Sequence, residues 1–302
     1  MAVIRIPEIH DSDHAVLAAR AVAETLDHLG TRVFIKQELL RLIGKHRDEW
    51  RILDRVPPKK IVDYLLTTFP LRKITLEGPD HSQQFQRYLW RDADPLEVAA
   101  SVRSPKSYLC HSSALFMHGL VDDLPKELCV NYEQSPKARP TGDLTQASLA
   151  SAFQGKQRQS AFTFRYKKHV IVVLSGKNTG GFEVQPLSIS TGATVQVTGL
   201  ERTLIDVTVR PTYAGGVQNV LQAFRRAQGR ISIDKIISTL QELDYVYPYH
   251  QAIGFYLARA GYPKHHLAGL KEIGMNLDFY LAHGMRETTY DKDWKVHYPS
   301  GL

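Results

Sequence analysis

The chain has 302 residues, of which 43% are apolar and 23% charged, an ordinary globular composition long enough for two or three domains. Two cysteines exclude a disulfide framework, no signal-peptide pattern opens the chain, and the longest aliphatic run, Val170–Leu174, is too short to span a bilayer. We therefore expect a cytoplasmic protein without a membrane partner. The net charge of +7 favours an anionic partner.

The first predicted helix covers Asp11–Gly30, with Ala15, Val22 and Leu26 on one face and acidic residues on the other, which is typical of a scaffold helix. The stretch that follows, residues 31–91, holds thirteen Lys and Arg against seven Asp and Glu. This excess of six is nearly the whole net charge of the chain.

Two helices and a hairpin are predicted inside this basic stretch. The first helix covers Ile35–Ile43 and is ended by Gly44, and the second begins at Pro57, where a proline suits the first turn. The second helix has an apolar stripe of Val62, Leu65, Leu66 and Phe69, with Lys59, Lys60, Asp63 and Thr67 largely outside it. Two strands, Leu71–Glu77 and Phe85–Arg91, then surround a polar loop at residues 78–84.

A basic helix pair followed by a basic hairpin is the layout of a winged helix, which grips phosphates and places a helix in a groove of double-stranded DNA. For any single side chain, a solvated surface charge is the better explanation, but the whole set favours DNA. The predicted DNA-binding residues are Lys36, Arg41, Lys45, Lys59, Lys60, Arg72, Lys73 and Arg87.

The rest of the chain predicts a linker with a short helix over residues 92–103, then a helix within Tyr108–Leu120 capped by Ser112 or Ser113 and ended by Gly119. Strands are predicted at 128–132, 161–174 and 194–197, with loops and one short helix over 133–155. The segment SGKNTGG lacks the spacing of a phosphate-binding loop and predicts a hairpin turn. Five helices are predicted over 201–209, 217–227, 232–243, 247–260 and 263–274.

The predicted fold class is α+β: an N-terminal winged helix-turn-helix followed by a mixed domain of a small β-sheet and a helical bundle. The DNA-binding domain covers residues 1–93. The second domain covers 94–302, β-rich over 94–200, helical over 201–274 and strand-like over 275–302.

No self-sufficient catalytic group is visible in the sequence. His111 and His118 lack further zinc ligands at compact spacing, Cys110 beside His111 lacks a group to orient the imidazole, and Asp206 lacks a second acid. We expect hydrogen-bonded histidines, buried thiols and a buried acid. The protein is thus expected to be no enzyme and to hold no metal or cofactor.

Two further basic clusters are candidates for a partner surface or a second nucleic-acid surface. The first combines Arg158, Arg165, Lys167 and Lys168 with the aromatic residues Phe162, Phe164 and Tyr166. A charged edge strand protected against aggregation explains it equally well. The second is Arg225 and Arg226, for which the solvated face of a helix is the alternative.

Segment 199–216, GLERTLIDVTVRPTYAGG, resembles the "ERTLLD…RP…AGG" segment of the AbiEi-type antitoxins of type IV toxin–antitoxin systems. YLCHSSALFMHGL at 108–120, DPLEVA at 94–99 and DKDWKVHYP at 291–299 follow the same family in order. The run from Lys45 to Val56 is longer than the usual turn of the family, which leaves the choice of recognition helix open.

The resemblance implies an autorepressor that binds inverted repeats in its own promoter. It also implies a C-terminal domain that neutralises a nucleotidyltransferase-like toxin, by direct contact or otherwise. Two alternatives stay open: a winged-helix regulator whose C-terminal domain senses an effector or is an enzyme, using His111, His118 or Asp206, and a plain regulator without a toxin.

Overall fold

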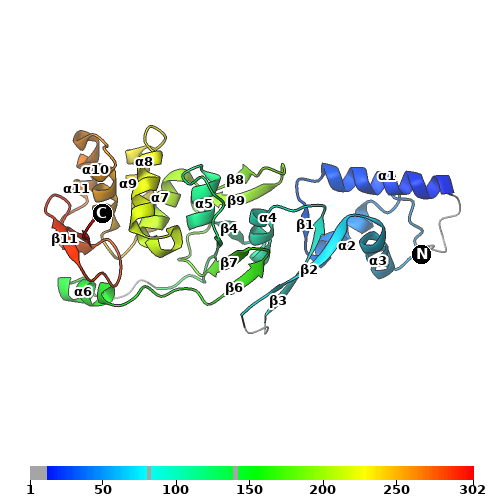
Figure 1. Ribbon diagram of the computed structural model, residues 1–302, viewed down its shortest axis with the longest axis horizontal. Coiled ribbons are helices and arrows are strands. Elements are labelled where there is room, and N and C mark those ends of the chain that lie inside the picture. The colour runs from blue at the N-terminus through cyan, green and yellow to red at the C-terminus, as the bar shows by residue number, and fades with distance from the viewer. Residues whose placement is uncertain (1–11, 80–82, 139–141) are drawn as a thin grey trace.

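The computed structural model describes residues 12–79, 83–138 and 142–302, without the side chains of residues 12–17, and it shows a mixed α+β protein. The predicted helix start at Asp11 and the side chain of Ala15 lie outside the described residues. Figure 1 shows an elongated molecule with the N-terminal elements at one end, a sheet in the middle and helices at the other end. No helix among the described residues combines the length and apolar character needed to cross a membrane.

The N-terminal unit places three helices against a small sheet with strand order β1-β3-β2. Its core surrounds the indole rings of Trp50 and Trp90, both at most 1% exposed. The bounds predicted for the helices and strands of this unit agree with the structure within two residues. Gly44 does not end α2 as predicted, because the helix continues to Lys45. The elements of the unit are α1 (Ser12–His28), β1 (Val33–Phe34), α2 (Lys36–Lys45), α3 (Pro58–Thr68), β2 (Leu71–Glu77) and β3 (Gln84–Trp90).

The two faces of this small sheet pack against different partners. On one face, Leu71 and Tyr88 join the core beneath the helices. On the other face, Leu76 and Leu89 join a core shared with the middle of the molecule. Residues opposite each other in an antiparallel pair point to the same face, so every second residue of β2 and β3 faces the rest of the chain.

Residues 92–103, predicted as a linker with a short helix, form a buried connection. Helix α4 (Pro95–Ala100) and the 3-10 turn η1 (Ser101–Arg103) place Leu96 and Val98 in the shared core at no more than 1% exposure. The Glu97 carboxylate accepts hydrogen bonds from Thr31 Oγ1 at 2.7 Å and from the amide of Val33 at 3.0 Å. These contacts anchor the N-terminal unit to the middle of the molecule.

The central sheet has six strands in the order β6-β7-β5-β4-β9-β8, with parallel pairs β5–β7 and β4–β9. Strand β8 was not predicted. SGKNTGG is not a hairpin turn: it connects β7 to β8, which lie at different positions with three strands between them. The strands are β4 (Ser107–Leu109), β5 (Glu127–Tyr132), β6 (Thr163–Tyr166), β7 (His169–Leu174), β8 (Val184–Ser188) and β9 (Thr194–Thr198).

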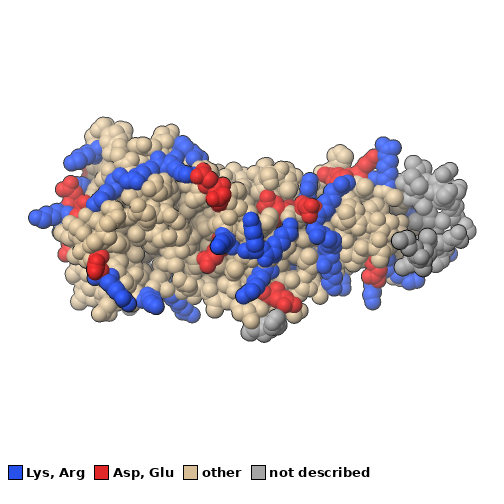
Figure 2. All heavy atoms as spheres, viewed as in Figure 1, with Lys and Arg blue, Asp and Glu red and all other residues tan. Residues whose placement is uncertain are grey.

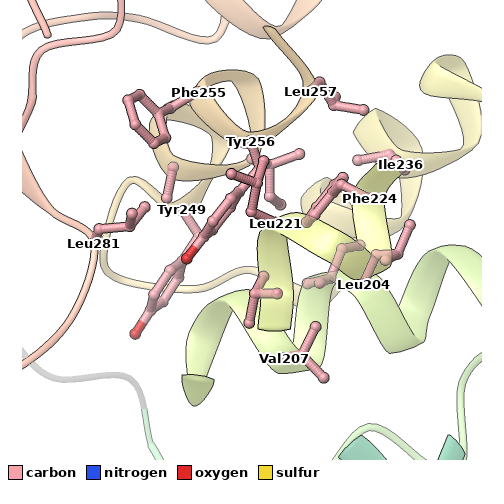
Figure 3. Packing of buried hydrophobic residues seen from close by; sticks show 14 of the residues in the cluster. Leu204, Val207, Leu221, Phe224, Ile236, Tyr249, Phe255, Tyr256, Leu257 and Leu281 are labelled. Carbon is pink, nitrogen blue, oxygen red and sulfur yellow. The ribbon is translucent and has the colours of Figure 1, made fainter. Parts of the chain in front are cut away.

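The helices of the C-terminal part enclose a third core, shown in Figure 3. Phe224 and Tyr256 stack there with ring centroids 5.3 Å apart. Gly254 leaves no room for a Cβ beside the Trp294 ring, so a glycine is needed in α10. The helices are α5 (His111–Met117), α6 (Gln146–Gln154), α7 (Leu200–Val209), α8 (Val217–Arg226), α9 (Ile233–Leu243), α10 (Tyr249–Arg259) and α11 (Ala268–Glu272), with 3-10 turns η2 (Pro211–Ala214) and η3 (Lys264–Leu267).

The strand-like tail is confirmed as a small sheet of β10 (Phe279–Tyr280), β12 (Val296–Pro299) and β11 (Thr288–Asp291), in that order. The predicted helix 263–274 is divided into η3 and α11. The predicted caps of α5 are wrong: Cys110 is the N-cap, while Ser112 donates to the carbonyl of Glu127 at 2.7 Å. The helix ends as predicted, with Gly119 at a φ of +65°.

Candidate functional site

The first turn of α3 presents a positive, solvent-facing surface. Ile61, Val62 and Leu65 form the buried stripe of α3. Lys59 and Lys60 lie outside that stripe and are exposed, as predicted. Because Pro57 and Pro58 lack amide hydrogens, they suit the start of a helix, where no intrahelical acceptor is available.

The predicted basic residues of α2 divide between two environments. Lys36 is exposed at the first position of the helix. Arg41 and Lys45 are also exposed, but they line a groove of about 600 Å³ between α2 and the middle of the molecule. Their side of α2 therefore faces η1 and β9.

The hairpin of β2 and β3 holds two further predicted residues at its surface. Lys73 is exposed and lies opposite Tyr88, on the sheet face that carries the N-terminal core. Arg72 is exposed on the other face, and its Nη2 lies 3.1 Å from Asp92 Oδ1. An exposed pair of this kind contributes little to stability, so Arg72 stays available to a phosphate.

Arg87 was predicted to contact DNA, and the structure contradicts this because the side chain is only 5% exposed. Its Nε donates to Ser101 Oγ at 2.9 Å, and Nη2 donates to the carbonyl oxygens of Ser101 at 2.6 Å and Val102 at 3.1 Å. Burial lowers the pKa of the guanidinium. The cause is register: Arg87 lies opposite Ile74 on the sheet face that packs against the rest of the chain.

The second basic cluster lies around an edge strand. Arg165 is on β6, at one edge of the central sheet, and Lys167 and Lys168 form the tight turn into β7, all exposed. The neighbouring aromatic rings are not a surface for stacking bases: Phe164 is 1% exposed and packs against Phe85 with centroids 5.0 Å apart. This observation favours the protected-edge explanation.

The remaining predicted cations lie outside β6 and its turn into β7. Arg158 and Arg225 are exposed. Arg226 donates to both carboxylate oxygens of Asp122, at 2.7 and 2.6 Å. On the face shown in Figure 2, Lys and Arg side chains cover several regions of the molecule, with Asp and Glu among them.

A cavity of about 520 Å³ lies between the central sheet and α7. Strand β7 contributes Leu174, the N-cap of α5 contributes Cys110, and the loop after β7 forms part of the rim. Helix α7 contributes the buried pair Arg202 and Asp206, with Nε and Oδ1 2.8 Å apart. Asp206 was predicted to be a buried, hydrogen-bonded acid, and its partner is the arginine one turn earlier. Burial raises the pKa of Asp206, and the Arg202 guanidinium opposes that shift.

His111 also lines this cavity and is 8% exposed. Burial, together with the positive charges of Arg210 and Arg202, lowers the pKa of His111 to about 3, so the ring is neutral. Its Nδ1 is buried and has no hydrogen-bond partner in the structure described. The prediction of a hydrogen-bonded histidine therefore fails at this atom, although a hydrogen bond with the backbone of Asp206 acts on the ring and raises its pKa against the effect of burial. The same prediction is confirmed for His118, whose Nε2 lies 2.7 Å from the carbonyl oxygen of Thr198.

The loop SGKNTGG surrounds an internal anion beside the cavity. The amides of Thr179 and Gly180 donate to Glu133 Oε2 at 2.9 Å each, and Tyr108 donates to Oε1 at 2.9 Å. Burial raises the pKa of Glu133, but these hydrogen bonds outweigh it and leave the pKa lowered. The loop amides are thus occupied by a side chain of the protein itself.

Sequence reasoning missed Arg202, Arg210 and Lys177 as residues lining the cavity. An Arg and an Asp four residues apart on a helix are neighbours on its surface, and that spacing was a usable signal for the first pair. Cys110 and Cys129 are free and buried, as predicted. Within the described ranges, no three His, Cys, Asp or Glu side chains gather closely enough to hold a metal ion.

No family model matches the chain, and no curated protein matches it. The chain is similar to a solved structure, the crystal structure of RV2827C protein from Mycobacterium tuberculosis. The TM-score is 0.54 and the sequence identity 15%, over 93% of this chain and 91% of that chain. At this identity, the likeness concerns the fold alone.

Proposed function

We propose that the N-terminal unit is a winged helix that binds double-stranded DNA, with α3 as the recognition helix and the β2–β3 hairpin as the wing. The observation that carries the proposal is the order of elements along the chain, which is helix, strand, helix, helix, strand, strand, with the sheet order β1-β3-β2. In addition, Lys59 and Lys60 are exposed at the start of α3. Asp63 and Thr67 are exposed further along α3, where base edges would lie.

The proposed phosphate contacts differ from the sequence prediction. Lys36, Lys59, Lys60, Arg72 and Lys73 remain, since all are exposed on the N-terminal unit. Arg87 is removed from the set because its guanidinium is bonded inside the protein. Arg41 and Lys45 become peripheral, because they line the groove toward the middle of the molecule.

We further propose that the protein is an AbiEi-type antitoxin, which represses its own promoter and neutralises a nucleotidyltransferase-like toxin. This part rests on the sequence resemblance of segments 108–120 and 199–216. Those two segments form α5 and α7, which contact each other beside the cavity.

Fluorescence anisotropy on the inverted repeats of its own promoter tests the DNA proposal. Five phosphate contacts predict a log–log salt slope of about −4.5, so affinity falls roughly 500-fold from 50 to 200 mM salt. The variant K59Q/K60Q should flatten the slope by about 1.8. R286Q, at an exposed arginine in the C-terminal loop, is the matched control. Salt-independent binding, or no binding to the repeats, refutes the proposal.

Co-expression with the product of the adjacent reading frame tests the antitoxin proposal. If that product is a nucleotidyltransferase-like toxin, the full chain should restore growth, and K59Q/K60Q should restore it equally well. Growth arrest that persists with folded, expressed protein refutes the antitoxin half and leaves the DNA half standing.

A further inference from the structure

The cavity between the central sheet and α7 has an excess of positive charge. Lys137, Lys177, Arg202 and Arg210 line it, against the acids Asp206 and Asp244. The Asp206 carboxylate is already paired with Arg202 inside the protein. The cations that remain therefore outnumber the acids.

Two of these cations differ in how they are held. Lys177 Nζ donates to the backbone carbonyl oxygens of Leu243 at 2.7 Å and Asp244 at 2.8 Å, which fixes its charge at the rim. Arg210 is half-buried, and its guanidinium makes no hydrogen bond or ion pair within the structure described. An arginine presents several N–H donors in a planar fork that matches a carboxylate or a phosphate.

A second, independent observation points to a ligand in the same cavity. The His111 ring is more than nine-tenths buried, and its Nδ1 lacks any hydrogen-bond partner in the residues described. Leaving such an atom unpaired costs free energy, because water has been removed and nothing replaces it. The atom is closed to solvent in the structure, so a polar group of a bound molecule would satisfy it after a small rotation of the ring toward the cavity.

The shape of the cavity limits the kind of occupant. A volume of about 520 Å³ lies within the range of pockets that hold small molecules and is too small for a macromolecule. Leu174, Val209 and Tyr245 add apolar surface to its lining. The site is thus suited to a molecule with an organic body and an anionic end.

We propose that this cavity binds a small organic anion, whose carboxylate or phosphate group pairs with Arg210 while a polar atom of the same molecule hydrogen-bonds His111 Nδ1. This site goes beyond the proposed DNA-binding and antitoxin functions. It also gives a specific location to an effector in the C-terminal part of the chain.

Thermal unfolding of the full chain tests the proposal with inorganic phosphate, succinate, glucose 6-phosphate and adenosine monophosphate as probes. Sodium chloride at equal ionic strength is the reference. At least one of the organic probes should raise Tm in a saturable way, and calorimetry should give its Kd. Succinate separates carboxylate recognition from phosphate recognition, and inorganic phosphate shows what the organic body adds.

R210Q should weaken binding of the active probe at least tenfold, R210K should weaken it less, and R286Q should bind like the wild type. H111N tests the second proposed contact, at His111 Nδ1, independently of Arg210. If no organic probe binds saturably, or if both R210Q and H111N bind like the wild type, the proposal is wrong. DNA binding is measured separately, so failure of one proposal is distinguishable from failure of the other.

Discussion

The neutral, buried imidazole of His111 should make the protein sensitive to mild acid. Its pKa falls from 6.5 to about 3 on folding, chiefly because burial disfavours the charged ring. Below pH 6.5 the unfolded chain binds a proton that the folded chain does not. The contribution of the His111 ring to the free energy of unfolding is therefore complete above pH 6.5 and is lost as the pH falls toward 3.

The size of this effect follows from linkage. One pH unit within that window corresponds to about 1.4 kcal/mol, so moving from pH 7 to pH 5 should remove about 2 kcal/mol through His111 alone. His118, His250 and His283 also have lowered pKa values, chiefly through burial, so the whole protein loses more. A difference between variants isolates the contribution of one ring.

The assay is urea unfolding followed by circular dichroism at pH 7 and pH 5. His111 has a φ of +46°, and asparagine tolerates that left-handed region better than most residues, so His111→Asn is the least disruptive change. The wild type should lose about 2 kcal/mol more than H111N between the two pH values. The exposed His265→Asn serves as control and should behave like the wild type. Equal losses in the wild type and H111N would refute the reasoning.

Two further predictions concern buried arginines. Arg87→Met should destabilise the protein by about 2–3 kcal/mol, because the carbonyl oxygens of Ser101 and Val102 lose their donor. It should leave the salt slope of DNA binding unchanged in the folded protein, and a flatter slope would contradict its assignment to the interior. Arg202→Met should cost about 3–5 kcal/mol by leaving Asp206 buried and unpaired. In urea unfolding, R202M/D206L should recover most of that loss, and a double variant as unstable as R202M would contradict it.

Local pattern was sufficient for much of the fold. The helical stripe of α3 placed Lys59 and Lys60 at the surface, because which side of a helix is buried follows from its own sequence. The strands β2 and β3 and most helices of the C-terminal part follow equally from short stretches of apolar residues. The two buried thiols were expected from the presence of only two cysteines. None of these predictions required knowledge of a distant segment.

Arg87 marks the limit of such reasoning. The alternation of a strand says which residues share a face, but not whether that face meets solvent or another sheet. Only the packing of the N-terminal sheet against the middle of the molecule turned Arg87 inward. The same applies to SGKNTGG, whose composition indicated a hairpin turn. The strand order of the central sheet separates β7 from β8, so the segment that connects them is no hairpin turn.

The cavity depended most completely on tertiary structure. The sequence by itself determined that His111, Asp206 and Arg202 exist and that α7 is a helix. Only folding brought His111 beside a helix about ninety residues further along the chain and left Arg210 there without an ion-pair partner among the described residues. The pair of Arg202 and Asp206, in contrast, follows from their spacing on α7. Charge and burial at this site result from neighbours distant in sequence, so residue spacing alone could not predict them.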